Sequence, residues 1–246
     1  MPKNSSLGED VLVVVPTYNE RDNVKEFAKQ IRKHVPRADV LFVDDASPDG
    51  TADVVKELAR TIPGLHLMQR TGKRGLGVSY QAGFLWGLER GYSKIVQMDA
   101  DLSHDPADVP RLLMAVDSCD FALGSRYVAG GRIVGWPLRR WLLSRFANLF
   151  AKCLFGLHVR DVTAGFRCWR ASVLTRMDVS SLRTDGYAFA IETTWRANQL
   201  GFQAKEVPVV FRERLRGISK MGLRAALQGL REVSCLILNH WGFSFA

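Results

Sequence analysis

Cysteine and long apolar runs are both scarce in this 246-residue sequence. Its four cysteines, Cys119, Cys153, Cys168 and Cys235, include no Cys-x-x-Cys pair, so we expect reduced thiols in apolar surroundings rather than a disulfide scaffold or a cysteine-ligated metal. No stretch supplies the roughly twenty uninterrupted apolar residues of a membrane-spanning helix. Residues 1–10 are polar and lack the apolar core of a secretory signal. Together these absences favour a cytoplasmic protein.

The common phosphate-binding signatures are also missing. The glycine-rich turn over residues 71–77, Thr-Gly-Lys-Arg-Gly-Leu-Gly, fits neither Gly-x-Gly-x-x-Gly nor the Walker pattern. It therefore gives no support for dinucleotide binding or P-loop chemistry. Two interpretations stay open: Lys73 and the amides at the following helix start reach a phosphate, or the glycines serve close packing beside a solvated Lys-Arg pair.

What the sequence does contain is positive charge. The formal net charge is +9, with 47% hydrophobic and 24% charged residues, the composition of an ordinary folded protein. An excess of this size calls for an anionic partner: nucleic acid, acidic lipid headgroups or a phosphorylated substrate. The length fits one large domain. We expect a polar tail over residues 1–10, the main domain over 11–220, and a C-terminal amphipathic helix and tail over 221–246.

Short apolar runs alternate with helical patterns along the chain. A continuous β-branched run at Val11–Val15 predicts a central strand covered on both faces, and Asn19 and Thr51 are the expected helix N-caps. The alternation predicts a mostly parallel, Rossmann-like α/β sheet flanked by helices. Further strands are expected at 40–43, 65–68, 94–98, 120–123 and 206–211, and helices at about 20–34, 52–60, 78–90 and 108–116.

Two later segments have a different character. Residues 128–140, with several glycines and a Trp-Pro pair, are expected to form a loop. Residues 141–157 are apolar except for a narrow stripe of Ser144, Arg145, Asn148 and Lys152. Such a segment lies in a membrane surface or packs against a partner or the core. A second amphipathic helix is expected at about 222–239.

Two carboxylates follow the strand predicted at 94–98. Asp99 and Asp101 end an apolar run, at the edge where open α/β sheets place their ligands. Carboxylate oxygens suit Mg²⁺ or Mn²⁺ carrying a diphosphate, whereas an isolated Asp-x-Asp is also typical of an acidic turn or a helix cap.

Six short sequence blocks favour the metal-site interpretation of Asp99 and Asp101 over an acidic turn or helix cap. Occurring in this order, they together resemble the family 2 glycosyltransferases of the GT-A fold. Among these, the closest pattern is that of the polyprenyl- or dolichyl-phosphate mannose synthases. The blocks are Pro16–Glu20, Val43–Thr51, Lys73–Gly77, Met98–His104, Gly124–Tyr127 with Asp161–Arg167, and Ser219–Lys220.

The resemblance implies a role for individual residues. The nucleotide-sugar site would comprise Pro16, Tyr18, Glu20, Val43, Asp45, Lys73, Asp99, Ala100 and Asp101. Asp99 and Asp101 would hold the metal. Ser103 stands where some relatives place a glutamine ligand, so a direct bond from it is doubtful. The acceptor phosphate would meet Arg126, Arg140, Arg214, Ser219 and Lys220, and the catalytic residues would be Asp101, Arg126 and Arg214.

The resemblance also implies a reaction. This is metal-dependent, inverting transfer of mannose from GDP-mannose to a polyprenyl (dolichyl-type) monophosphate, with Mg²⁺ or Mn²⁺ as cofactor. The protein would be peripheral on the cytosolic face of a bacterial plasma membrane or the endoplasmic reticulum, with a membrane-spanning partner subunit left open. One alternative is a UDP-sugar donor such as UDP-glucose. The other is a basic RNA-binding protein, which the absence of an RNA-binding signature disfavours, so no nucleic-acid partner is expected.

Overall fold

The structure is a computed structural model that describes residues 8–71, 75–213 and 233–234. Its strands are β1 (Val11–Thr17), β2 (Asp39–Asp44), β3 (Leu65–Gln69), β4 (Lys94–Gln97), β5 (Phe121–Ser125), β6 (Arg132–Val134), β7 (Arg167–Arg170), β8 (Ala204–Pro208) and β9 (Val210–Arg212). Its helices are α1 (Arg21–His34), α2 (Thr51–Thr61), α3 (Leu76–Glu89), α4 (Val109–Val116), α5 (Leu138–Phe155), α6 (Ala171–Arg176) and α7 (Gly186–Gln199), with short 3₁₀ turns η2 (Pro106–Asp108) and η3 (Val179–Ser181).

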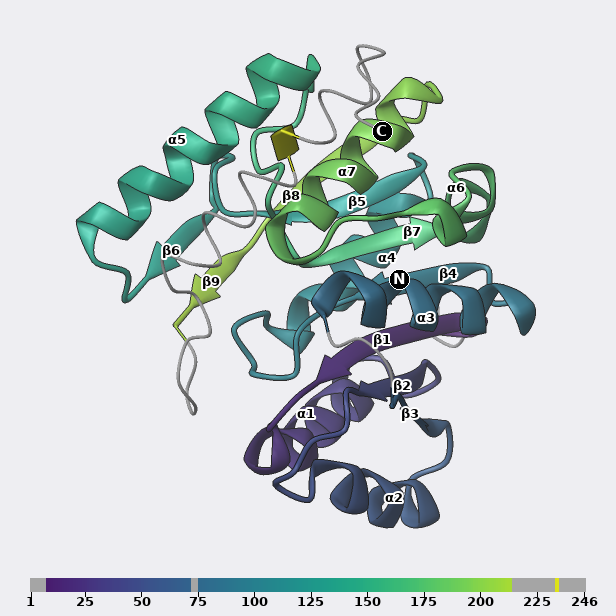
Figure 1. Ribbon diagram of the computed structural model, residues 1–246. Helices are drawn as coiled ribbons and strands as arrows, with labels where there is room; N and C mark the ends of the chain where they lie inside the picture. Colours follow the sequence, from purple (N-terminus) through teal and green to yellow (C-terminus); the bar gives the residue numbers. More distant parts are fainter. Residues whose placement is uncertain (1–7, 72–74, 214–232, 235–246) are drawn as a thin grey trace, which may run out of the picture.

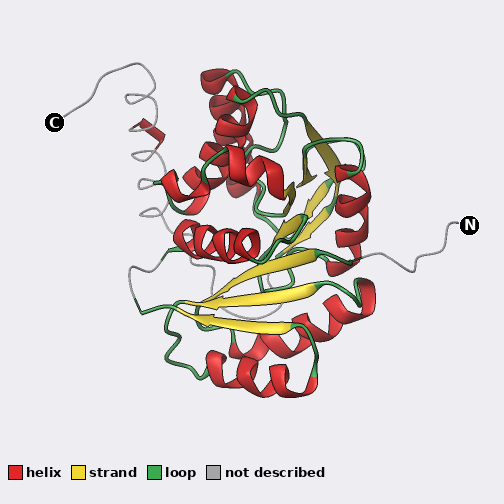
Figure 2. Cartoon of the chain, turned by 90° about the vertical axis from the view of Figure 1, so that its right-hand side faces the viewer, coloured by secondary structure: helices red, strands yellow, loops and turns green. Residues whose placement is uncertain are grey.

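Seven of these strands form one sheet in the order β3-β2-β1-β4-β7-β5-β8. All neighbours are parallel except β7, which runs antiparallel to both β4 and β5. Helices cover both faces of the sheet (Figures 1 and 2). The predicted class, a mostly parallel α/β sheet flanked by helices, is confirmed.

Alternation along β1 explains the two cores. Its side chains point to opposite faces in turn: Leu12 and Val14 pack with α3 and α7, while Val13 and Val15 pack with α1 and α4. Because both faces are covered, every one of these positions is apolar and fully buried. The sheet order reverses between β1 and β4, and open α/β sheets bind ligands at the carboxyl ends of the strands at such a point.

Several predicted boundaries shift. Asn19 is not the cap of α1; Glu20 is, and Asn19 sits in a turn with a φ of 57°. Thr51 is the first residue of α2 rather than its cap. Its hydroxyl instead accepts a hydrogen bond from the backbone N–H of Glu20 at 3.0 Å, so it ties two loops together.

The strands in the second half of the chain differ more from those expected from the sequence. The single strand expected at 206–211 is divided into β8 and β9. The expected loop over 128–140 contains β6, which pairs in parallel with β9 in a separate two-stranded sheet. The antiparallel strand β7 was not predicted, because its four residues, Arg-Cys-Trp-Arg, alternate too briefly to stand out.

Helix α5 begins at Leu138, three residues before the predicted start, and it lies at the periphery of the molecule (Figure 1). It is the longest described helix at 18 residues, and within the described ranges no helix is long and apolar enough to cross a membrane. One side of α5 exposes eight large apolar side chains, here called the outer face: Leu138, Trp141, Leu142, Leu143, Phe146, Leu149, Phe150 and Leu154.

Two sequence expectations are decided only in part. Apolar surroundings are confirmed for Cys168, which is buried, and wrong for Cys153, which is exposed on α5; Cys235 lies outside the described residues. The domain division at 11–220 and 221–246 stays a prediction. The expected helix at 222–239 also falls almost wholly outside the described ranges.

Candidate active site

A cleft of about 870 Å³ opens at the carboxyl ends of β1 and β4. Ten of the residues predicted from the sequence line it: Pro16, Tyr18, Glu20, Asp45, Asp99, Ala100, Asp101, Ser103, Arg126 and Arg140. Val43 does not, since it is fully buried in the core. Lys73, Arg214, Ser219 and Lys220 lie outside the described residues. The fold thus brings most of the predicted site together, whereas the individual roles stay predictions.

The acidic pair follows β4 directly. The hydroxyl of Tyr80, on α3, donates to Asp99 Oδ1 at 3.0 Å. Complete burial, reinforced by the Asp99 charge, raises the pKa of Tyr80 well above its usual value, so the phenol keeps its proton and remains a donor. Asp101 is buried, and its Oδ1 accepts the backbone N–H of Ser103 at 3.0 Å. Both carboxylates are therefore held in fixed orientations.

His104 supports the same turn. Its Nδ1 accepts the backbone N–H of Asp99 at 3.2 Å, and its ring stacks on Phe166 with centroids 5.2 Å apart. A ring held in this way orients the acidic turn, and the nitrogen facing Asp99 is occupied.

The carboxylates of Asp99 and Asp101 fit a divalent cation whose other ligands come from a substrate and from water. No cluster of three or more His, Cys, Asp or Glu side chains occurs in the described ranges. Asp99 and Asp101, which both line the cleft, would be the carboxylate ligands. Mg²⁺ is commonly bound by one or two carboxylates together with waters and substrate phosphates. The pair suits such an ion better than a closed, all-protein metal site.

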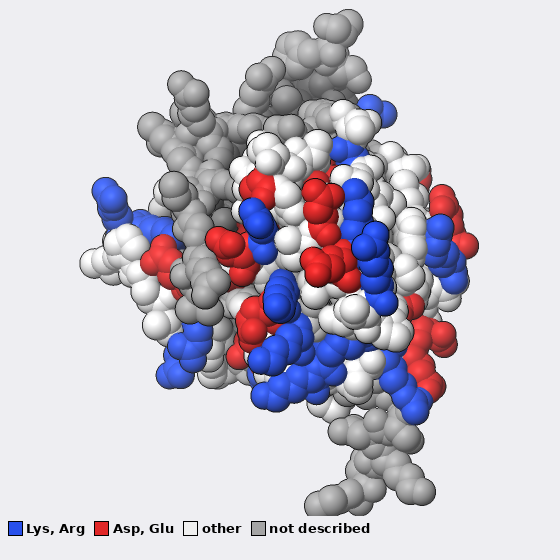
Figure 3. Space-filling view, turned by 90° about the horizontal axis from the view of Figure 1, so that it is seen from below, with Lys and Arg blue, Asp and Glu red and all other residues white. Residues whose placement is uncertain are grey.

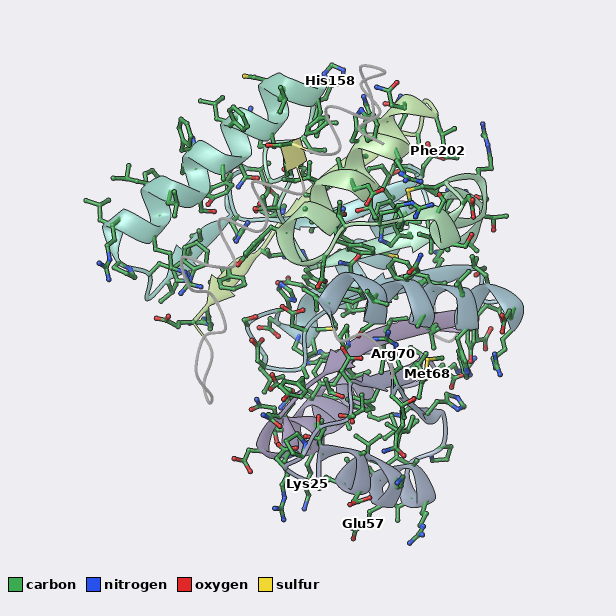
Figure 4. All side chains as sticks on the ribbon, in the orientation of Figure 1. Lys25, Glu57, Met68, Arg70, His158 and Phe202 are labelled. Carbon is green, nitrogen blue, oxygen red and sulfur yellow. The ribbon has the colours of Figure 1, made fainter. Side chains whose placement is uncertain are left out.

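On the β1–β2 side of the cleft, the carboxylate of Asp45 holds the glycine-rich turn. Asp45 accepts hydrogen bonds from Arg70 Nη1 at 2.6 Å and from the backbone N–H of Gly75 at 3.0 Å. Arg70, labelled in Figure 4, also donates to the Ser79 hydroxyl at 3.0 Å. Asp45 therefore fixes the end of the glycine-rich turn against the end of β2. A carboxylate offers about four acceptor positions, so Asp45 keeps capacity for a ligand.

The glycine-rich turn is also held from the opposite half of the molecule. Asp185 caps α7 and accepts the backbone N–H of Gly77 at 2.6 Å. A Cβ on Gly77 would lie 2.5 Å from the Thr184 carbonyl oxygen, so a side chain at this position would push the two segments apart. The glycine is required here for close packing, which supports one of the two interpretations open from the sequence and leaves the role of Lys73 undecided.

The far wall of the cleft carries arginines. Arg126 donates to Asp161 from Nε at 2.8 Å and from Nη2 at 2.6 Å, and its backbone N–H donates to the same carboxylate. Burial by itself would lower the pKa of Arg126, but the adjacent Asp161 charge raises it above the ordinary value. Arg140 pairs with Glu213 at 3.0 Å and stacks over the Trp136 ring. Both cations reach the cleft already oriented.

Sequence reasoning missed several of these contributors. Tyr80 and Arg70 belong to no recognisable motif. Asp161 lies in the Asp161–Arg167 block, but the sequence assigned it no role. Glu192, an acidic residue of α7, is fully buried, where it accepts hydrogen bonds from Thr184 and pairs with Arg196. It is thus placed in a structural network rather than on the cleft wall.

Comparison with known proteins places the chain among glycosyltransferases. The sequence model of Glycosyl transferase family 2 matches residues 12–178. The chain is 50% identical, over 212 residues, to a polyprenol monophosphomannose synthase of Mycolicibacterium smegmatis, covering 85% of this chain and 80% of that protein. It is 44% identical to an undecaprenyl-phosphate mannosyltransferase of Micrococcus luteus, covering 90% and 97%.

Solved structures show the same fold at low identity. A mannosyltransferase from Pyrobaculum calidifontis in complex with GDP-mannose and Mn²⁺ superposes with a TM-score of 0.60 and 20% identity, covering 92% of this chain and 64% of that one. Glucosyl-3-phosphoglycerate synthase from Mycobacterium tuberculosis gives a TM-score of 0.68 and 17% identity, covering 96% and 81%. These are GT-A enzymes, so the GT-A fold expected from the sequence is confirmed.

Proposed function

The chain belongs to glycosyl transferase family 2, and on that premise we propose that it transfers mannose from GDP-mannose to a polyprenyl (dolichyl-type) monophosphate. One observation carries the reaction class: the cleft joins a carboxylate half, built on Asp45, Asp99 and Asp101, to an arginine half, built on Arg126 and Arg140. The first half suits a metal-bound nucleoside diphosphate and the second suits an acceptor phosphate. The mannosyl group and the polyprenyl phosphate follow from the names of the two relatives at 50% and 44% identity, and GDP-mannose is the donor that the sequence resemblance implies.

The acceptor chemistry explains why the cleft needs no general base. The second ionisation of a phosphate monoester lies near pH 6, so its oxygen is already an anionic nucleophile at neutral pH. His104, the imidazole on the cleft wall, uses Nδ1 to orient the acidic turn. The protein's task is then to position the two anions and offset their repulsion.

The chain's own residues divide that task. Asp99 and Asp101 would hold Mg²⁺ or Mn²⁺, which when bound neutralises charge on the leaving diphosphate. Arg126, fixed by Asp161, presents a permanent positive charge at the opposite wall. Attack from that wall on the anomeric carbon, in line with the diphosphate, inverts its configuration. Arg suits the phosphate because its planar fork allows bidentate contacts.

A lipid acceptor places the enzyme at a membrane. We propose peripheral association with the cytosolic face, in agreement with the net charge of +9. The membrane-spanning partner subunit considered from the sequence is tested by asking whether the purified chain alone acts on an acceptor embedded in vesicles. Because the chain belongs to glycosyl transferase family 2, we drop the alternative of an RNA-binding protein.

The testing experiment measures labelled sugar entering an organic-extractable product. Purified protein receives Mg²⁺ or Mn²⁺, a polyprenyl phosphate, and labelled GDP-mannose or UDP-glucose in parallel. We expect transfer from GDP-mannose, and Asp101→Asn should lower the rate by about a hundredfold or more. Asp53→Asn, an exposed carboxylate on α2, is the matched control and should leave the rate unchanged.

Each other outcome contradicts a different part of the proposal. Transfer only from UDP-glucose would keep the mechanism and replace the donor. Near-normal metal-dependent turnover by Asp101→Asn would remove the acidic pair from the metal site.

A further inference from the structure

Helix α5 is folded inside out for a water-soluble protein. Beside the buried Ala151 and Phe155, its inner side carries the polar Asn148: Asn148 is buried, its amide donates to the Thr163 hydroxyl at 3.0 Å, and its Oδ1 accepts the Thr163 backbone N–H. The outer face carries the apolar side chains instead. It holds eight of the thirteen exposed large apolar side chains in the described part of the chain, and a concentration of this kind marks an interaction surface.

The charge of α5 indicates which partner covers that face. Its 18 residues include four cations, Arg139, Arg140, Arg145 and Lys152, and no acidic residue. The face of the molecule that carries α1 and α2 mixes blue and red side chains (Figure 3). An apolar helix face on a helix whose charged residues are all cations is complementary to an anionic lipid surface, where apolar residues enter the interface and cations meet headgroups.

The inner side of α5 is built onto the active site. Thr163, which holds Asn148, also accepts a hydrogen bond from Arg126 Nη2 at 3.0 Å. One turn earlier, Ser144 accepts a hydrogen bond from the Tyr127 hydroxyl at 2.7 Å. In the first turn, Arg140 lines the cleft itself. The outer face therefore has a fixed position relative to the arginine wall of the cleft.

We propose that the outer face of α5 is a bilayer-docking surface, which lies in the interface of an anionic membrane and holds the arginine wall of the cleft at headgroup height. This inference rests on the proposed function, because a phosphate on a lipid acceptor is presented at that height. On its outer side, side chains of α5 project away from the body of the molecule (Figure 4). They can enter a lipid surface without any rearrangement of the core.

The test compares two matched double variants. Phe146→Gln/Leu149→Gln changes side chains that are 64% and 60% exposed on the outer face; Met114→Gln/Leu200→Gln changes side chains that are 57% and 40% exposed on α4 and after α7. Binding is measured by sedimentation with vesicles of phosphatidylcholine and phosphatidylglycerol, and with phosphatidylcholine alone. Mannose transfer is measured to a polyprenyl phosphate in those vesicles and to a short, water-soluble isoprenyl phosphate.

We expect the wild-type chain to bind the anionic vesicles, and high salt to weaken that binding. Phe146→Gln/Leu149→Gln should lower the partition constant at least about tenfold, since each buried apolar side chain contributes to insertion. Its transfer to the embedded acceptor should fall in parallel, while transfer to the soluble acceptor stays unchanged. The Met114→Gln/Leu200→Gln control should match the wild type in every assay.

Other results overturn the inference. Wild-type protein that transfers mannose to the soluble acceptor but binds no vesicles leaves the function and removes the docking surface. A wild-type dimer that Phe146→Gln/Leu149→Gln turns into a monomer, with vesicle binding unaffected, assigns the face to a second copy. Failure of the proposed function is distinct: vesicle binding persists and neither acceptor is mannosylated, which supports the docking surface alone.

Discussion

The ion pair between Arg126 and Asp161 gives the sharpest prediction about this site. Asp161 is 0% exposed and receives three hydrogen bonds of 2.6–2.8 Å from Arg126. Asp161→Asn keeps the shape of the side chain but removes its charge, and its amide group turns a donor toward a guanidinium that has only donors. The variant thus leaves an uncompensated positive charge in the interior.

The magnitude follows from burial. Removing one partner of a buried ion pair costs about 3–5 kcal/mol. A second pair provides the comparison: Lys94 and Asp117 also meet at 2.6 Å, but the Asp117 side chain is 67% exposed. Exposed pairs contribute about 0–1 kcal/mol. Asp161→Asn should therefore lower the free energy of unfolding by at least about 2 kcal/mol more than Asp117→Asn does.

Urea unfolding of the wild type and the two variants measures this difference. We also expect Asp161→Asn to reduce mannose transfer, because Arg126 loses the group that orients it in the cleft, whereas Asp117→Asn should be as active as the wild type. If the two variants lost stability to within about 0.5 kcal/mol of each other, burial would not set the strength of the Arg126–Asp161 pair and the reasoning would be refuted.

Three further predictions concern the acidic turn, the glycine-rich turn and a buried thiol. Tyr80→Phe, which removes the donor to Asp99, should weaken apparent metal affinity about 10–100-fold in a metal titration of the transfer rate. Gly77→Ala should lower the free energy of unfolding by about 1–3 kcal/mol, measured in urea, because its Cβ meets a backbone carbonyl. Burial raises the pKa of Cys168 to about 12, so peptide-resolved alkylation at about pH 8.5, where an ordinary thiol ionises, should label exposed Cys153 and spare Cys168. Because the Cys168 thiol loses its proton at lower pH in the unfolded chain than in the folded protein, the free energy of unfolding should fall as the pH rises from about 8.5 toward 12. The Cys168→Ala variant should show a smaller fall over the same range.

A specific result would contradict the prediction for each of Tyr80, Gly77 and Cys168. Unchanged metal dependence in Tyr80→Phe would separate that phenol from the metal site. Wild-type stability in Gly77→Ala would show that the neighbouring segment moves without cost. Rapid alkylation of Cys168 in the folded protein would contradict its burial between the sheet and the helices.

Local patterns in the sequence were sufficient for much of the site. Val11–Val15 predicted a strand covered on both faces, and the structure buries all five residues. Asp99 and Asp101 were found because they follow such a strand directly, and strand ends meet at one edge of a parallel sheet. The family resemblance added the cleft residues of the second half, such as Arg126.

Contacts between distant residues could not be found in this way. Thirty-five positions separate Arg126 from Asp161, and 108 separate Gly77 from Asp185, with no repeated spacing to connect them. The antiparallel strand β7 begins at the last residue of the Asp161–Arg167 segment and lies between β4 and β5, so it brings that segment next to the end of β5. Only that topology makes Asp161 the partner of Arg126.

Helix α5 shows the division most clearly. Its sequence determined that there would be a helix, mostly apolar with a narrow polar stripe, because the 3.6-residue period is a local property. The sequence left open which side would face the protein, since an apolar majority ordinarily packs inward. The tertiary structure decided it, because Asn148 and Ser144 hydrogen-bond to Thr163 and Tyr127 while Ala151 and Phe155 pack into the core, and these contacts turn the other apolar side chains outward.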